Sequence, residues 1–241
     1  MNIEAISLSL LGEAFEELSE AVCENWEGNE EPSPVLISKA MLQLLEVLTQ
    51  NEAETSPRNR LNPEEIDELG EYGLTLLQEM SAIAYDLGLN DSAEQIEDLT
   101  FPFAVWLSRH NVELRKIDPV VNSLTRKASM ISEPHLLKQL FNYVNEIIDS
   151  LSPSISQDLE KTSQDRPWRV LLINRALIAA RTHDTELMKI AFDMLAESLP
   201  EEASRFFEEI VEQMHIVNYP DHVREVLQHY FLMHGTSHTL H

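Results

Sequence analysis

Glycine is scarce in this chain of 241 residues: there are 6 glycines, and none lies between Gly88 and Gly235. Phosphate-binding loops need closely spaced glycines, because backbone N–H groups must wrap around the anion. The only close pair, Gly70 and Gly73, falls within a helical apolar stripe. The sequence therefore gives no support to nucleotide binding through the common glycine-rich loops.

Cysteine occurs once, so Cys23 cannot form an internal disulfide. A catalytic thiol needs a histidine or a cation beside it, whereas the next residue here is Glu24. No Gly-x-Ser-x-Gly motif supplies an alternative nucleophile. We expect Cys23 to behave as a small buried hydrophobic residue.

Long apolar runs are also missing, since no stretch reaches the roughly 18 residues of a membrane-spanning helix. The nearest, Val170 to Ala180, is short and contains Asn174 and Arg175. The N-terminal segment carries glutamates, whereas a secretory signal begins with positive charge. We therefore expect a cytoplasmic protein that has no membrane partner.

Positive charge is in short supply as well, with 17 Lys and Arg against 42 Asp and Glu and a net charge of −25. The excess is uneven, because residues 1–116 alone hold 6 basic and 24 acidic residues, a net −18. Such a surface repels nucleic acid and attracts a basic partner, although acidity also serves solubility. We expect a protein partner, with a basic one favoured, and no nucleic acid.

Apolar residues recur at helical spacing nearly throughout the chain, and strict alternation of the kind found in strands is almost absent. In the first segment Leu11, Phe15, Leu18 and Val22 form one stripe, which predicts an amphipathic helix. Residues 35–48 form a second helix with a broader apolar face. The pattern predicts an all-α protein.

Prolines that follow a capping residue mark the expected helix starts. Asn62-Pro63-Glu64-Glu65 is the clearest case, and it follows a polar connector over 51–62. Short connections favour packed antiparallel hairpins, about ten helices in all, in a bundle or a short array. We expect one domain over 1–241, in which 1–62 could be a looser N-terminal hairpin.

The C-terminal third resembles tetratricopeptide repeats, helix pairs with a period of about 34 residues. Phe192 matches the aromatic position of a second helix, and Pro200 matches the terminal proline. Phe206 then matches the first-helix aromatic position of a following repeat. Three positions depart from the pattern: Met188, Leu195 and Glu209. The resemblance implies a helical scaffold that binds a peptide or protein on a concave face.

The segment from Trp168 to Arg181 is apolar around most of its circumference, which is typical of a central helix. Polar side chains nevertheless interrupt it. One interpretation is a set of structural salt bridges with acidic neighbours. The other is a groove that receives a partner's carboxylate or amide, for which the planar guanidinium is suited. The candidate partner-binding residues are Arg169, Asn174, Arg175 and Arg181.

The final helix offers the one candidate metal site. Glu225 and His229 lie four residues apart and share a helix face, and His222 lies seven before His229. Carboxylate and neutral imidazole are ligands for zinc, iron or nickel. A pair of this kind is also common on exposed helix surfaces.

The sequence thus predicts a non-enzymatic helical scaffold or adaptor that binds another protein and needs no cofactor. The alternative is a metal-dependent helical-bundle enzyme that uses the ligands in the last helix. A homo-oligomer formed through a wide apolar face such as residues 35–48 remains open.

Overall fold

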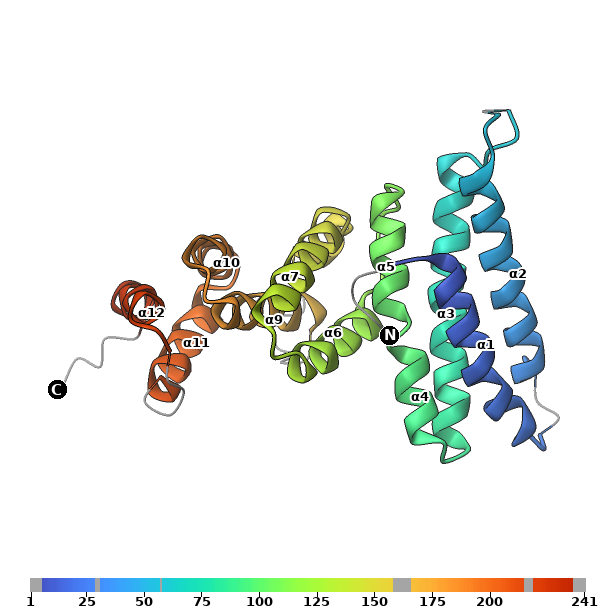
Figure 1. The fold of residues 1–241 in the computed structure, drawn as a ribbon, viewed down its shortest axis with the longest axis horizontal. Coiled ribbons are helices and arrows are strands. Elements are labelled where there is room, and N and C mark those ends of the chain that lie inside the picture. Colours follow the sequence, from blue (N-terminus) through green and yellow to red (C-terminus); the bar gives the residue numbers. More distant parts are fainter. Residues whose placement is uncertain (1–5, 29–30, 57, 158–165, 215–218, 236–241) are drawn as a thin grey trace. The chain divides into compact units, whose positions relative to one another are not determined.

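The computed structural model describes residues 6–28, 31–56, 58–157, 166–214 and 219–235 (Figure 1). Within these residues the fold is all-α, as the sequence predicts, and no strand occurs. One isolated parallel bridge joins Leu114 to Leu151. No helix among the described residues is long and apolar enough to cross a membrane.

The chain divides into two compact units, which are described separately. Unit 1 comprises residues 1–127 and 143–157, and unit 2 comprises residues 128–142 and 158–241. The boundary expected near residue 62 falls inside unit 1. The single domain expected over 1–241 stays a prediction.

Unit 1 begins with five helices that pack on one another. They are α1 (Leu8–Glu24), α2 (Pro34–Ala53), α3 (Pro63–Asp86), α4 (Asn90–Glu97) and α5 (Thr100–Arg109). Helix α2 packs against both α1 and α3, and α3 also packs against α4 and α5 (Figure 1). Helix α6 (Asp118–Met130) and helix α7 (Pro134–Asp149) each contribute to both units, and α8 (Pro153–Ser156) is a single turn of unit 1.

The helix starts follow the capping signals in the sequence. The Asn62 side chain accepts a hydrogen bond from the Glu65 N–H at 2.9 Å, and the Glu65 carboxylate accepts one from the Asn62 N–H at 2.8 Å. This capping box satisfies two N–H groups that a helix start leaves unpaired. At the other end of α3 the chain turns through Gly88, whose φ of +76° suits glycine.

The sequence analysis placed the start of the connector too early, at residue 51, because α2 continues to Ala53. Two contacts explain the extra turn. The indole N–H of Trp106, buried in α5, donates to the Glu52 carboxylate at 2.8 Å. The Asn51 side chain accepts a hydrogen bond from the Leu61 N–H at 2.8 Å. Polar residues that read as a loop are therefore held in the helix by tertiary partners.

Unit 2 contains α9 (Pro167–Thr182), α10 (Thr185–Ser198), α11 (Pro200–Gln213) and α12 (Asp221–His234). Each of these helices packs against the next one in the chain, and α10 also packs against α12. Phe192 lies at the centre, with its ring centroid 5.2 Å from those of Phe207 and Tyr230. Edge-to-face aromatic contacts therefore join α10, α11 and α12.

Gly73 permits the close approach of α3 to α5 and α2. A Cβ at this position would lie 2.6 Å from the Phe103 ring and 3.3 Å from a Leu44 methyl group. Because both neighbours are buried, they have little room to move. Gly73 thus lies in a helix, as the apolar stripe predicted, and serves helix packing.

We expect Gly73→Ala to lower the free energy of unfolding of unit 1 by about 1–2 kcal/mol, because overpacking outweighs the gain in helix propensity. Gly12→Ala is the control, since its Cβ would meet only Leu45 at an ordinary 3.6 Å. It should stabilise by about 0.5–1 kcal/mol. Urea unfolding of both variants measures the difference, and equal effects would contradict this account of the α3 contact.

Candidate partner-binding site

Arg175 lies in the interior of unit 2, with 3% of its surface exposed. Its guanidinium carbon is 4.8 Å from the centroid of the Phe141 ring, and Nη1 donates to the Ile190 carbonyl at 3.3 Å. A cation over an aromatic face and a backbone acceptor both offset the cost of burying the charge. These contacts hold the Arg175 side chain within unit 2, against an aromatic face and a backbone carbonyl.

The other candidates in α9 also have partners within unit 2. Arg181 donates to the carbonyl oxygens of Ala128 and Ile131 and so ties the end of α9 to the end of α6. The buried Asn174 side chain donates to the Val170 carbonyl at 3.0 Å, within its own helix. The structure therefore does not gather these side chains around one open groove, and their role in partner binding stays a prediction.

Arg169 belongs to an ion-pair cluster at the start of α9. Its Nε lies 2.9 Å from the Glu202 carboxylate of α11, and Arg166 Nη2 lies 3.4 Å from the same group. Burial favours the protonated form of Glu202, but the hydrogen bond from Arg169 and the positive charges of Arg169, Arg166 and Arg205 outweigh it and lower the pKa of this carboxyl. The cluster joins α9 to α11.

The three candidate metal ligands are exposed on α12. His222 Nε2 lies 3.2 Å from the His183 carbonyl, so this nitrogen donates a hydrogen bond there. The His229 ring lies edge-on to Tyr230, with centroids 5.7 Å apart. Glu225 is the third of these candidates. Among the residues that the structure describes, no group of three or more His, Cys, Asp or Glu side chains could hold a metal ion.

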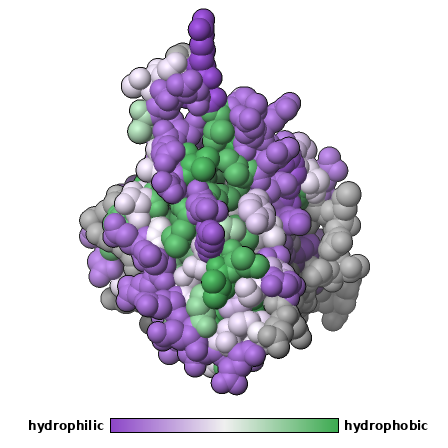
Figure 2. Space-filling view, turned by 90° about the vertical axis from the view of Figure 1, so that its right-hand side faces the viewer, coloured by the Kyte–Doolittle hydropathy of each residue, from purple (hydrophilic) through white to green (hydrophobic). Residues whose placement is uncertain are grey.

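A further surface lies on the outer side of α2, within the broad apolar face that the sequence analysis noted over residues 35–48 as a possible homo-oligomer contact. Val35, Leu36 and Val47 are 57%, 51% and 42% exposed. Leu42 is half-buried and lines a shallow groove of about 400 Å³. We call these four residues the α2 apolar face. Figure 2 shows this side of the molecule, with a band of hydrophobic residues bordered by hydrophilic ones.

The groove runs along the junction of α1 and α2, and Cys23 of α1 lines it together with Val35 and Leu42. Contacts between small residues fix the junction. The Ser19 and Ser38 hydroxyls are 3.0 Å apart and form a hydrogen bond between the two helices. Ser19 is buried at this junction. Burial raises the pKa of the Cys23 thiol.

Acidic side chains lie on both helices that form the groove. Glu16 and Glu20 lie seven and three residues before Cys23, so the three side chains share one face of α1. Both glutamates are exposed, and no ion pair to either is found among the described residues. Glu46 lines the groove from α2, as does one cation, Lys39. The groove lining is therefore mainly apolar with one charge of each sign, and the exposed Glu16 and Glu20 add negative charge on the Cys23 face of α1.

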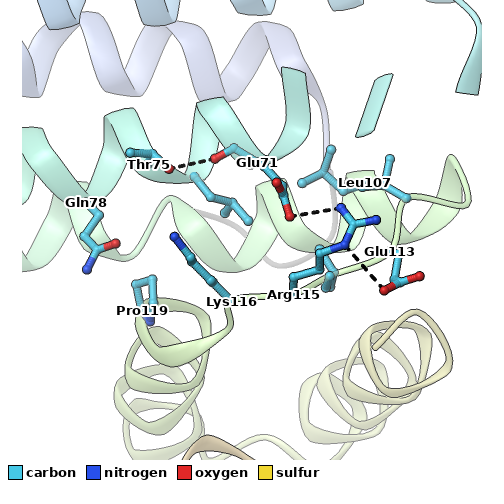
Figure 3. Close-up of a pocket in the computed structure, with 11 residues that line it drawn as sticks. Glu71, Thr75, Gln78, Leu107, Glu113, Arg115, Lys116 and Pro119 are labelled. Atoms are coloured by element: carbon cyan, nitrogen blue, oxygen red, sulfur yellow. Dashed lines mark hydrogen bonds and ion pairs between the residues drawn. The ribbon is translucent and has the colours of Figure 1, made fainter. Parts of the chain in front are cut away.

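A second pocket, of about 60 Å³, lies between α3 and the segment before α6 (Figure 3). Its rim carries an ion-pair network, in which Arg115 contacts Glu71 at 3.0 Å, Asp67 at 3.2 Å and Glu113 at 3.5 Å. Figure 3 shows Lys116 between Arg115 and Pro119, with Gln78 at the far end. Small-molecule sites have roughly 300–1,000 Å³, so this pocket has room for one small side chain.

We expect Arg175→Ala to lower the stability of unit 2 by about 2–4 kcal/mol, since it leaves a cavity and an uncovered Phe141 ring in the interior. Arg205→Ala removes an exposed arginine of α11 and should change stability by less than about 0.5 kcal/mol. Thermal unfolding of both variants tests this. An Arg175→Ala protein as stable as the wild type would favour the open groove that the sequence suggested.

Comparison of the chain with protein-family models, with curated proteins and with solved structures finds no match. The tetratricopeptide resemblance of the C-terminal third therefore stays a prediction. Its aromatic positions, Phe192 and Phe206, are both buried, and their ring centroids lie 5.8 Å apart. The geometry described above is the basis for the assignment of function.

Proposed function

We propose that the chain is a non-enzymatic helical scaffold that binds a protein partner, and that the α2 apolar face and the adjoining groove are the binding surface. The supporting observation is the exposed apolar face of α2 beside a groove with acidic side chains on both of its helices. Contiguous apolar patches rimmed by polar residues mark interaction sites on folded proteins. The partner that fits this surface is basic and carries apolar side chains.

The apolar residues on this face supply the affinity. Burying one half-exposed Val or Leu side chain contributes roughly 0.5–1.5 kcal/mol, so several together give useful binding energy. Leu36 and Val47 are eleven residues apart on the same side of α2, and Val35 and Leu42 are seven apart on the side of the groove. The face therefore extends along most of the helix.

The charges supply the selectivity. Residues 1–116 carry a net −18, and this field attracts cationic partners while it repels phosphate backbones and anionic lipid. A second copy of the chain meets the same repulsion, because symmetric pairing would bring two acidic surfaces together. These charges favour a basic partner over nucleic acid, a membrane or a homodimer on this face.

We expect the double variant Val35→Ser, Val47→Ser to lose its partner. The tagged protein is used to capture partners from native lysate, and bound proteins are identified and quantified by mass spectrometry. Because both residues are exposed, the substitutions should leave the fold intact. The expected result is a stoichiometric partner with the wild type, and at least a severalfold lower yield with the variant.

The matched control is Leu232→Ser, Met233→Ser, which removes two exposed apolar side chains of α12 in unit 2. This control should retain the partner. If it loses the partner and the α2 variant does not, the binding surface belongs to unit 2 and the proposed surface is wrong. Turnover of a substrate that depends on a residue of a pocket would contradict the non-enzymatic assignment.

A further inference from the structure

We infer that the occupant of the α1–α2 groove is an amphipathic helix of a partner protein, with apolar residues on one face and lysine or arginine on the sides. This inference rests on the proposed function and names the class of partner. The shape of the groove, the spacing of its apolar residues and the charge around it each support it.

The shape favours a helix. Helix α2 packs against α1 and α3, and its third side carries the α2 apolar face, which no described helix covers. With 20 residues α2 is about 30 Å long, and a partner helix of similar length can lie alongside it. Binding of an extended peptide by strand addition needs an unpaired sheet edge, and the described residues form no strand. The surface therefore suits helix-in-groove binding.

The spacing agrees with this geometry. Val35 and Leu42 are seven residues apart, which places them two turns and about 10.5 Å apart along α2. Partner helices present their anchors at positions i, i+3 or i+4, and i+7, over the same distance. One apolar face of a partner helix can thus cover both residues and the Cys23 side of the groove.

The charges define the sides of that helix. Glu16 and Glu20 are exposed on the face of α1 that carries Cys23, and Glu46 lines the groove from α2. A lysine or arginine on each side of the partner's apolar face would reach these carboxylates. Lys39 also lines the groove, and one acidic residue on the partner could pair with it. An acidic amphipathic helix would meet repulsion on both sides.

The test uses the whole chain and a synthetic helical peptide of about 18 residues, long enough to cover α2. Leucines occupy positions i, i+3, i+4 and i+7, and lysines and glutamines occupy the rest. One comparison peptide has the same composition in an order that spreads the leucines around the helix. A second comparison peptide has glutamate in place of lysine. Fluorescence anisotropy of labelled peptide measures affinity at low and high salt.

The expected result is saturable one-to-one binding of the basic amphipathic peptide, weakened by salt, with both comparison peptides at least roughly tenfold weaker. Glu16→Gln, Glu20→Gln should weaken binding about three- to tenfold. The matched control, Glu209→Gln, Glu212→Gln, removes two exposed charges of α11 and should leave the affinity unchanged. Equal loss in the two variants would overturn the assigned site.

Cys23 provides a reporter at the site itself, because it is the chain's one cysteine and it lines the groove. Saturating peptide should slow modification of the thiol by a maleimide at least severalfold. Unchanged modification of a protein that binds the peptide would place the peptide elsewhere and overturn the inference.

Failure of this inference is distinguishable from failure of the proposed function. If the peptides do not bind, yet the Val35→Ser, Val47→Ser variant still loses its captured partner, the face binds a protein that is not a basic helix. If the chain pairs with itself and Val35→Ser, Val47→Ser abolishes the pairing in sedimentation equilibrium, a second copy is the occupant, and the helix inference is wrong.

Discussion

The close contact of α3 with α5 and α2 at Gly73 is the constraint that sets the arrangement of unit 1. With no Cβ at this position, the Phe103 ring and Leu44 reach the α3 backbone, and α2 is drawn against α3 on its inner side. The Ser19–Ser38 hydrogen bond then fixes α1 on a second side of α2. A helix held on two sides has one side left, and on α2 that side carries apolar residues.

The charge around this remaining side of α2 determines which class of partner it attracts. Three arginines of α9 make contacts within unit 2: Arg175 with Phe141, Arg169 with Glu202 and Arg181 with the end of α6. The exposed Glu16 and Glu20 of unit 1 have no such counterpart among the described residues. The arginine contacts stabilise unit 2, while these glutamates of unit 1 produce a negative potential that attracts a basic partner.

Much of the fold could be predicted from local signals. The helix start at Asn62-Pro63 depends on groups within a few residues, so the sequence carries it directly. The end of α2 could not be predicted in this way, because Glu52 is held by Trp106, 54 residues away. The orientation of Arg175 also depends on a tertiary contact, since its partner Phe141 belongs to another helix. The sequence showed that the apolar face over residues 35–48 is broad, but only the packing of α1 and α3 shows that Val35, Leu36 and Val47 are the exposed part of it.

The most direct test of the central claim is amide hydrogen exchange of the whole chain with and without the saturating basic amphipathic peptide. The account predicts slower exchange in α1 and α2, centred on the segments around Cys23 and Leu42, with α9 to α12 unchanged. Protection confined to α9 to α12, or to the pocket beside Arg115, would contradict the assignment of the α1–α2 groove as the binding surface.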